Sequence, residues 1–176
     1  MSETHERIAI LDFGSQYTQL IARRIRELGV YSEIYPFDVD LRQRRGGEVK
    51  GIVLSGGPDS VYQPGAPVPG PGLLDMGVPL LGICYGMQWM MRELGGRVQP
   101  AQEREYGPAN VMVENGDSLL FNGLDVRQSV WASHGDRVLE PAPGFKVVAT
   151  NPSVPSAAVE DRRGPVSYTH LTLPTN

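Results

Sequence analysis

Cysteine and histidine are scarce in this 176-residue sequence, which has one cysteine, Cys84, and three histidines. A single cysteine cannot form a disulfide within the chain, and residues 1–6 lack the basic and apolar segments of a secretion signal. No apolar run approaches the roughly 18 residues that a membrane-spanning helix needs. The sequence therefore predicts a cytoplasmic protein with no membrane partner.

Charge of one sign is not concentrated anywhere in the chain. The 16 basic and 20 acidic residues are scattered and give a formal net charge of −4. Proteins that bind nucleic acid usually gather basic residues to neutralise phosphates. We therefore expect no nucleic-acid partner, and we expect no metal site. The length fits one domain with its own core.

Short apolar runs in the first half of the chain alternate with segments whose apolar residues recur at helical spacing. Such alternation is typical of an α/β domain with a mostly parallel sheet, whose functional sites lie at the carboxyl ends of the strands. The expected strands are 7–11, 31–37, 51–54 and 78–83, and the expected helices are 17–28 and 85–94. Shorter strands are expected at 110–114, 128–132, 145–150 and 157–160, with a proline-rich surface loop at 63–72.

Residues 82–86, Gly-Ile-Cys-Tyr-Gly, lie between an expected strand and an expected helix. A Gly-x-nucleophile-x-Gly turn in this context holds its central side chain exposed in a strained conformation. A cysteine there lies at a helix N-terminus, which lowers the pKa of its thiol. Taken alone, Cys84 is more often a small buried apolar residue. The strand, turn and helix favour the nucleophile.

A nucleophile that attacks a carbonyl needs backbone donors for the oxyanion that forms. The N–H group of Tyr85, the residue after the nucleophile, is the natural first donor. Residues 55–58, Ser-Gly-Gly-Pro, follow the third expected strand and supply a second donor, for which we choose Gly57. From the residues alone, the alternative that this segment merely turns the chain stays open.

Three segments together resemble the class I glutamine amidotransferases: residues 12–19 (Asp-Phe-Gly-Ser-Gln-Tyr-Thr-Gln), 55–58, and 82–88 (Gly-Ile-Cys-Tyr-Gly-Met-Gln). The first and last, with 103–107 and 130–136, are similar to segments of the GMP synthase family. The resemblance covers about residues 7–163. It implies a flavodoxin-like three-layer fold, with a flexible N-terminus at 1–6 and an incomplete amidotransferase domain at 7–165.

The resemblance implies that Cys84 attacks the carboxamide of glutamine and that ammonia leaves, with the Gly57 and Tyr85 N–H groups as the oxyanion hole. The residues that it assigns to glutamine binding are Gln88, Ser133, His134, Gly135 and Asp136. It implies no cofactor for this glutaminase part.

In the GMP synthase family the ammonia passes to an ATP-pyrophosphatase (synthetase) domain, which uses ATP and magnesium to aminate xanthosine monophosphate. We find no such domain in this sequence. Residues 55–60, Ser-Gly-Gly-Pro-Asp-Ser, superficially match its phosphate-binding loop, but their place after the third strand fits the amidotransferase assignment. The resemblance also implies a homodimer for the full-length enzyme.

The sequence departs from the family's pattern at the residues that would supply the general base. The family's His and Glu lie in a late strand with the sequence Phe-His-Pro-Glu, whereas residues 166–176 have neither Pro nor Glu beside His170. We expect that the catalytic His and Glu are absent, that the last catalytic strand is missing and that 166–176 are a non-native, adapter-derived tail. His5 is expected to be inert. His134, with Asp136 to orient it, is a rival base that the family assigns to substrate positioning. The fragment is therefore expected to be inactive alone.

Two other functions compete with this interpretation. The chain resembles amidotransferase parts of anthranilate or carbamoyl phosphate synthases less well, because residues 12–17 and 133–136 fit GMP synthases. The other alternative is a non-catalytic flavodoxin-like docking module, with Cys84 as a structural or redox thiol. Protection of Cys84 by glutamine against a glutamine-like chloroketone separates that module from an amidotransferase.

Overall fold

The computed structural model describes residues 5–44, 47–114, 118–162 and 167–169, with the backbone alone at 101–106, 132–134 and 167–169. In chain order, the elements of the first half are β1 (Arg7–Asp12), α1 (Thr18–Glu27), β2 (Ser32–Pro36), η1 (Leu41–Gln43), β3 (Val49–Leu54), η2 (Leu73–Asp75), β4 (Leu80–Ile83) and α2 (Tyr85–Glu93). Those of the second half are β5 (Arg97–Val113), β6 (Arg127–Glu140), β7 (Phe145–Asn151), β8 (Val154–Asp161) and β9 (Ser167–Thr169).

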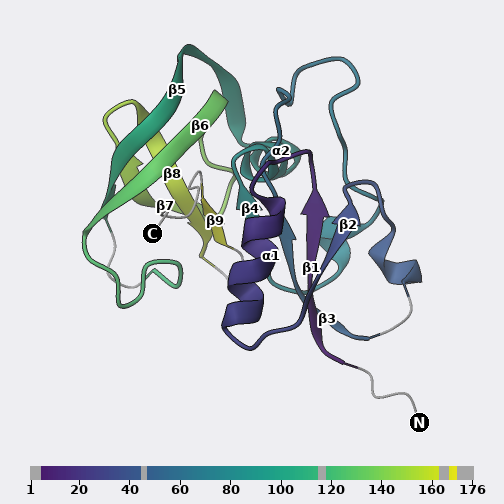
Figure 1. Ribbon diagram of the computed structural model, residues 1–176. Coiled ribbons are helices and arrows are strands. Elements are labelled where there is room, and N and C mark those ends of the chain that lie inside the picture. Colours follow the sequence, from purple (N-terminus) through teal and green to yellow (C-terminus); the bar gives the residue numbers. More distant parts are fainter. Residues whose placement is uncertain (1–4, 45–46, 115–117, 163–166, 170–176) are drawn as a thin grey trace.

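The strands form one sheet in the order β2-β1-β3-β4-β9-β8-β7-β5-β6. Strands β2, β1, β3 and β4 are parallel to their neighbours, which confirms the α/β prediction, and β9 is parallel to β4. The strands from β8 to β6 pair antiparallel. In Figure 1 the long β5 and β6 lie on the opposite side of the molecule from β2.

The two helices cover opposite faces of the parallel strands, as a three-layer fold requires. Alternate residues of a strand face opposite sides of a sheet. Ile10 and Val53 accordingly pack with α1 residues such as Ile21, and α1 lies in front of the parallel strands in Figure 1. Leu11 and Leu54 pack on the other face, in the same core as α2. Burying such a side chain contributes roughly 1.5–3 kcal/mol, so this double burial stabilises the central strands.

Two sequence-based expectations about strands are wrong. Residues 133–136 lie beyond the expected strand 128–132, but their backbone belongs to β6, where Ser133 pairs with Tyr106 and His134 with Glu105. Strand β5 begins at Arg97 rather than near 110, although Pro100 and Pro108 lack the N–H that a ladder uses. The register shifts between Pro100 and Glu105, whereas Pro108 pairs with Trp131 without a shift. Cross-strand hydrogen bonding therefore outweighs the local turn signals.

The expected gap beside β4 is also filled. Residues 167–169 form β9, which pairs with Leu81–Ile83 on one side and with Ala158–Glu160 on the other. Two open strand edges offer unpaired backbone groups, and a short extended segment between them satisfies both. We expected the last strand of the sheet to be missing, and this is wrong in one respect: β9 fills its position between β4 and β8. The Phe-His-Pro-Glu sequence itself is absent from the chain, and residue 166 and residues 170–176 lie outside the described part.

Residues 55–72, which link β3 to η2, contain no helix or strand, in agreement with the predicted proline-rich loop. In the part of the chain that the structure describes, neither helix is long and apolar enough to cross a membrane.

Candidate active site

The candidate site lies where three neighbouring parallel strands end. Asp12 is the last residue of β1, Ser55 follows β3, and Cys84 follows β4. Backbone and side-chain hydrogen bonds join these ends: Phe13 N–H donates to Ser55 Oγ at 3.0 Å, and Gly86 N–H donates to the Ser55 carbonyl at 3.2 Å. The segments that the sequence singled out therefore meet at the carboxyl edge of the sheet, where α/β proteins place their sites.

Cys84 occupies a strained turn between β4 and α2. Its φ of +48° and ψ of −109° make it the one residue other than glycine with positive φ in the described part of the chain. A β-carbon on Gly82 would lie 2.7 Å from Met87 N, and one on Gly86 would lie 2.6 Å from the Leu54 carbonyl oxygen. Both flanking positions therefore require glycine, and the backbone has the geometry that the nucleophile elbow predicts.

The thiol itself is not exposed as predicted. Cys84 is 5% exposed and packs in the α1-side core with Ile10, Ile21 and Val53. Burial raises the pKa of its thiol from 9.0 to about 12, which is opposite to the lowering expected at a helix N-terminus. The reason is that desolvation of the charged form outweighs the partial positive charge of the helix end. In this structure Cys84 is a neutral thiol at neutral pH.

The raised pKa predicts how the thiolate will titrate. Because the folded pKa lies above the ordinary 9.0, the thiol should stay protonated through pH 9 and ionise only as the pH approaches about 12. The measurement is the ultraviolet absorbance of the thiolate, taken as the difference between the chain and its Cys84→Ser variant. In denaturant the same difference should titrate near 9.0. A folded-state midpoint below that value would contradict the effect of burial.

The Gly56–Gly57 segment lies against both Cys84 and the loop after β1. A β-carbon on Gly56 would lie 3.5 Å from Cys84 Cβ, and one on Gly57 would lie 2.5 Å from the Phe13 carbonyl oxygen. The backbone at Gly57 is therefore packed directly on Phe13, with no room for a side chain. The segment chosen from the sequence as a second oxyanion donor is thus brought next to the elbow. Its role as a donor stays a prediction.

Gln88 and Asp136, two residues assigned to glutamine binding, contact each other. Both are buried, and Gln88 Nε2 donates to the Asp136 carbonyl oxygen at 2.9 Å. The Asp136 carboxylate accepts from Ser60 Oγ at 2.6 Å and from Val61 N–H at 3.2 Å. These bonds connect α2, β6 and the loop after β3. Asp136 therefore holds that loop in place, and its binding of substrate stays a prediction.

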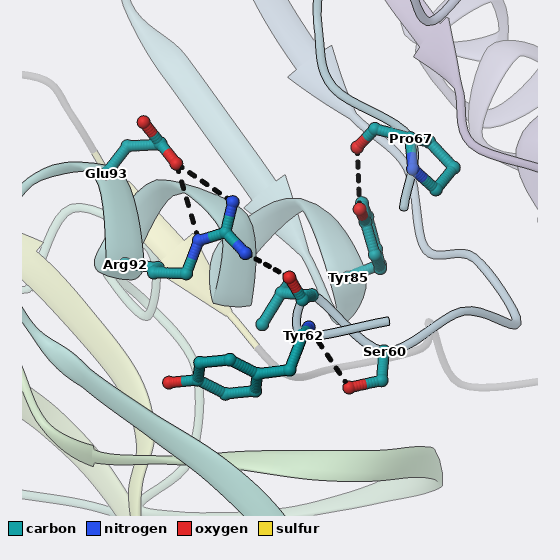
Figure 2. Close-up of polar contacts among 7 residues, drawn as sticks. Ser60, Tyr62, Pro67, Tyr85, Arg92 and Glu93 are labelled. Carbon is teal, nitrogen blue, oxygen red and sulfur yellow. Dashed lines mark hydrogen bonds and ion pairs between the residues drawn. The ribbon is translucent and has the colours of Figure 1, made fainter. Parts of the chain in front are cut away.

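The same loop is fixed over α2 by further polar contacts, which Figure 2 shows. Tyr85 Oη donates to the Pro67 carbonyl at 2.6 Å. Outside that view, the Tyr85 ring packs at a tilt on Phe13, with 5.3 Å between ring centroids. The guanidinium of Arg92 donates to the Val61 carbonyl and also pairs with Glu93 at 3.1 Å. The side chain of Tyr85 thus anchors the loop, while its backbone N–H remains the predicted donor.

The other predicted residues are less fully described. Only the backbone of Ser133 and His134 is described, within β6, and Gly135 is half-buried in the same strand. His5 is exposed before β1, and His170 lies outside the described residues.

Sequence reasoning missed Ser55 and Ser60 as functional candidates. Ser55 is 0% exposed and its hydroxyl contacts the backbone of Phe13 and Gly56, while Ser60 binds Asp136. Both belong to the segment that the sequence analysis quoted, yet a serine in a glycine-rich loop is typical of any turn. The partner of Ser60 lies 76 positions away, so no local pattern indicates it.

The sequence model of the class-I glutamine amidotransferase family matches residues 9–168. A GMP synthase (glutamine-hydrolysing) of Geobacillus kaustophilus is 55% identical over 158 residues, which are 90% of this chain and 31% of that protein. One from Lactobacillus acidophilus is 50% identical over 89% of this chain and 30% of its own length. The chain thus spans about a third of the length of these relatives.

Solved structures show the same fold. A Thermoplasma acidophilum protein, assigned as one component of a GMP synthase, superposes with a TM-score of 0.80 and 28% identity, covering 96% of this chain and 84% of its own. A glutamine amidotransferase of Thermotoga maritima superposes with a TM-score of 0.76 over 97% of this chain and 76% of its own. Its 21% identity supports the fold alone.

Proposed function

Because this chain belongs to the class-I glutamine amidotransferase family, we propose that its site hydrolyses glutamine through a thioester on Cys84. The single observation that carries the proposal is the elbow: a cysteine at φ +48° between two glycines whose α-hydrogens face packed backbone. A buried structural cysteine has no need of such a strained conformation. We take the strain as the cost of placing the cysteine at the carboxyl edge of the sheet.

The proposed chemistry proceeds in two steps. After its proton is removed, Cys84 Sγ attacks the carboxamide carbon of glutamine, and the C=O electrons move to the oxygen, which the Gly57 and Tyr85 N–H groups stabilise. Collapse of this tetrahedral intermediate breaks the C–N bond, and the nitrogen leaves as ammonia after it takes up a proton. Water then attacks the thioester and releases glutamate. We assign the amino-acid end of glutamine to Gln88 and residues 133–136.

A base is needed because the resting thiol is neutral, with its pKa at about 12. The family's Phe-His-Pro-Glu sequence is absent from these 176 residues, so we propose that the chain turns over glutamine negligibly by itself. Two steps of the reaction need this base: removal of the proton from Cys84, and activation of the water that cleaves the thioester.

For the longer protein, we propose that the released ammonia is used in the ATP- and magnesium-dependent conversion of xanthosine monophosphate to GMP. The support is the identity of 50–55% to relatives named glutamine-hydrolysing GMP synthase. The ATP-using domain, and a homodimer of the full-length chain, would belong to the two thirds of those relatives that this chain does not span. Amidotransferases of other synthases remain the alternative within the family.

Protection of Cys84 tests the proposal without requiring turnover. The chain is incubated with a chloroketone analogue of glutamine, and alkylation is followed by mass spectrometry. We expect saturating glutamine to slow the labelling at least about fivefold, while asparagine, which is one methylene shorter, should have little effect. Cys84→Ser serves as the control for labelling at other groups. Equal labelling rates with and without glutamine would support a docking module and refute the amidotransferase.

A further inference from the structure

The hydroxyl of Ser55 contacts the peptide unit that carries the predicted oxyanion donor. Ser55 Oγ donates to the Gly56 carbonyl oxygen at 2.9 Å, and the same Oγ accepts the N–H of Phe13 at 3.0 Å. The side chain is fully buried, so no water competes for either bond. One hydroxyl therefore links the loop after β1 to the loop after β3.

This contact fixes a direction as well as a distance. The Gly56 carbonyl and the Gly57 N–H belong to one planar trans peptide, in which C=O and N–H point in opposite directions. When Ser55 holds the carbonyl on one side, the Gly57 N–H must point to the other. Glycines on both sides of a peptide make rotation of its plane easy, because no β-carbon restricts φ and ψ. The hydroxyl therefore supplies a restraint that the local sequence does not.

The neighbours of this peptide support the same conclusion. The position of a β-carbon on Gly56 lies 3.5 Å from Cys84 Cβ, so the peptide adjoins the nucleophile. Ser55 Oγ also accepts a hydrogen bond from Phe13 N–H, and the carbonyl of the same Phe13 packs on Gly57. Ser55 thus joins the loop after β1 to the peptide that adjoins Cys84.

We propose that Ser55 is a positioning residue of the oxyanion hole, which orients the Gly56–Gly57 peptide so that the Gly57 N–H can bind the oxygen of a tetrahedral adduct on Cys84. The inference rests on the proposed function and extends it to Ser55, a residue to which the proposed function gives no role. Loss of the hydroxyl frees the peptide to rotate. Such loss weakens binding of the tetrahedral state while leaving the ground-state binding of glutamine unchanged.

An aldehyde analogue of glutamine, with –CHO in place of the carboxamide, tests this at equilibrium. The Cys84 thiol adds to the aldehyde: an S–C bond forms, the C=O π bond breaks, and the thiol proton moves to the oxygen. Adduct formation is an equilibrium that requires no general base, so it is measurable on the 176-residue chain. The tetrahedral carbon is observed by ¹³C NMR of the labelled aldehyde, and glutamine binding is measured separately by calorimetry.

We expect Ser55→Ala to weaken the aldehyde adduct about tenfold, because one oriented donor is lost, and to change glutamine affinity less than about twofold. Ser55→Thr, which keeps the hydroxyl, should restore the adduct. Ser32→Ala is the matched control: Ser32 is also fully buried and donates to a backbone carbonyl, that of Ala22, but on β2. Ser32→Ala should lower the melting temperature as Ser55→Ala does, but it should leave the stability of the aldehyde adduct unchanged.

The outcomes separate the two proposals. If the unaltered chain forms no adduct and binds no glutamine, the proposed function fails. If the unaltered chain forms the adduct and Ser55→Ala binds the aldehyde as well as the unaltered chain, or loses aldehyde and glutamine equally, the role of Ser55 is refuted. If Ser55→Ala does not fold, Ser55→Cys takes its place. Its weaker donor should then give a smaller loss in the same direction.

Discussion

A variant whose residues after Arg162 are replaced by a segment carrying Phe-His-Pro-Glu is expected to hydrolyse glutamine about a thousandfold faster than the 176-residue chain. General acid–base catalysis by a positioned side chain contributes typically 10²–10⁴ in rate. Here the effect should reach at least the middle of that range, because burial holds the pKa of Cys84 at about 12 and leaves hardly any thiolate at neutral pH. The measurement is glutamate release, coupled to glutamate dehydrogenase.

The control for this variant is the same replacement with Ala in place of its histidine, which should return the rate to that of the original chain. Cys84→Ser in the replaced background should abolish the reaction. Two results would contradict the expectation: equal turnover by the original and replaced chains, or turnover by the original chain that depends on His170. The second would show that residues 166–176 supply a base of their own.

Gly86→Ala is expected to destabilise the fold by about 3 kcal/mol or more. A β-carbon at this position would lie 2.5 Å from Leu54 Cβ and 2.6 Å from the Leu54 carbonyl oxygen, and both atoms belong to a central strand that cannot move aside. Overpacking of rigid interior atoms costs typically 1–3 kcal/mol and more where backbone is involved. The measurement is chemical denaturation, followed by circular dichroism.

Gly65→Ala makes the same chemical change where no atom lies within 4 Å of the new carbon. It should cost only about 1–2 kcal/mol, because the residue adopts a φ of +80°. Alanine is a better helix former than glycine, so Gly86→Ala in a loosely packed helix would be neutral or stabilising. Unchanged or increased stability of Gly86→Ala would therefore show that α2 does not approach β3 as closely as the structure indicates.

Much of the candidate site could be predicted from the sequence, because the elbow depends on local features. Glycines at 82 and 86, together with an apolar strand and a helix on either side of Cys84, specify the turn around it, and the structure has that turn. Loops that follow parallel strands meet at one edge, so the proximity of 55–58 to Cys84 was also predictable. The first strands and both helices agree with their predicted ranges to within a few residues.

The errors have a common physical cause, which is that long-range pairing and burial outweigh local signals. Residues 133–136 have the composition of a turn, but β5 offers pairing partners to 133, 134 and 136, so they are in a strand. Residues 167–169 follow no family pattern, yet the open edges of β4 and β8 place them in the sheet. The local sequence of neither segment indicates that it will pair as a strand.

The sequence by itself determined the family and the strained turn around Cys84, the proposed nucleophile, because these depend on the identity and spacing of adjacent residues. Only the tertiary structure decided the state of the thiol. Its pKa depends on side chains from β1, α1 and β3 that close around Cys84 and remove water. The tertiary structure also decided that Ser55 contacts the Gly56–Gly57 peptide and that Asp136 holds Ser60, since those contacts form only when separate strands are packed together.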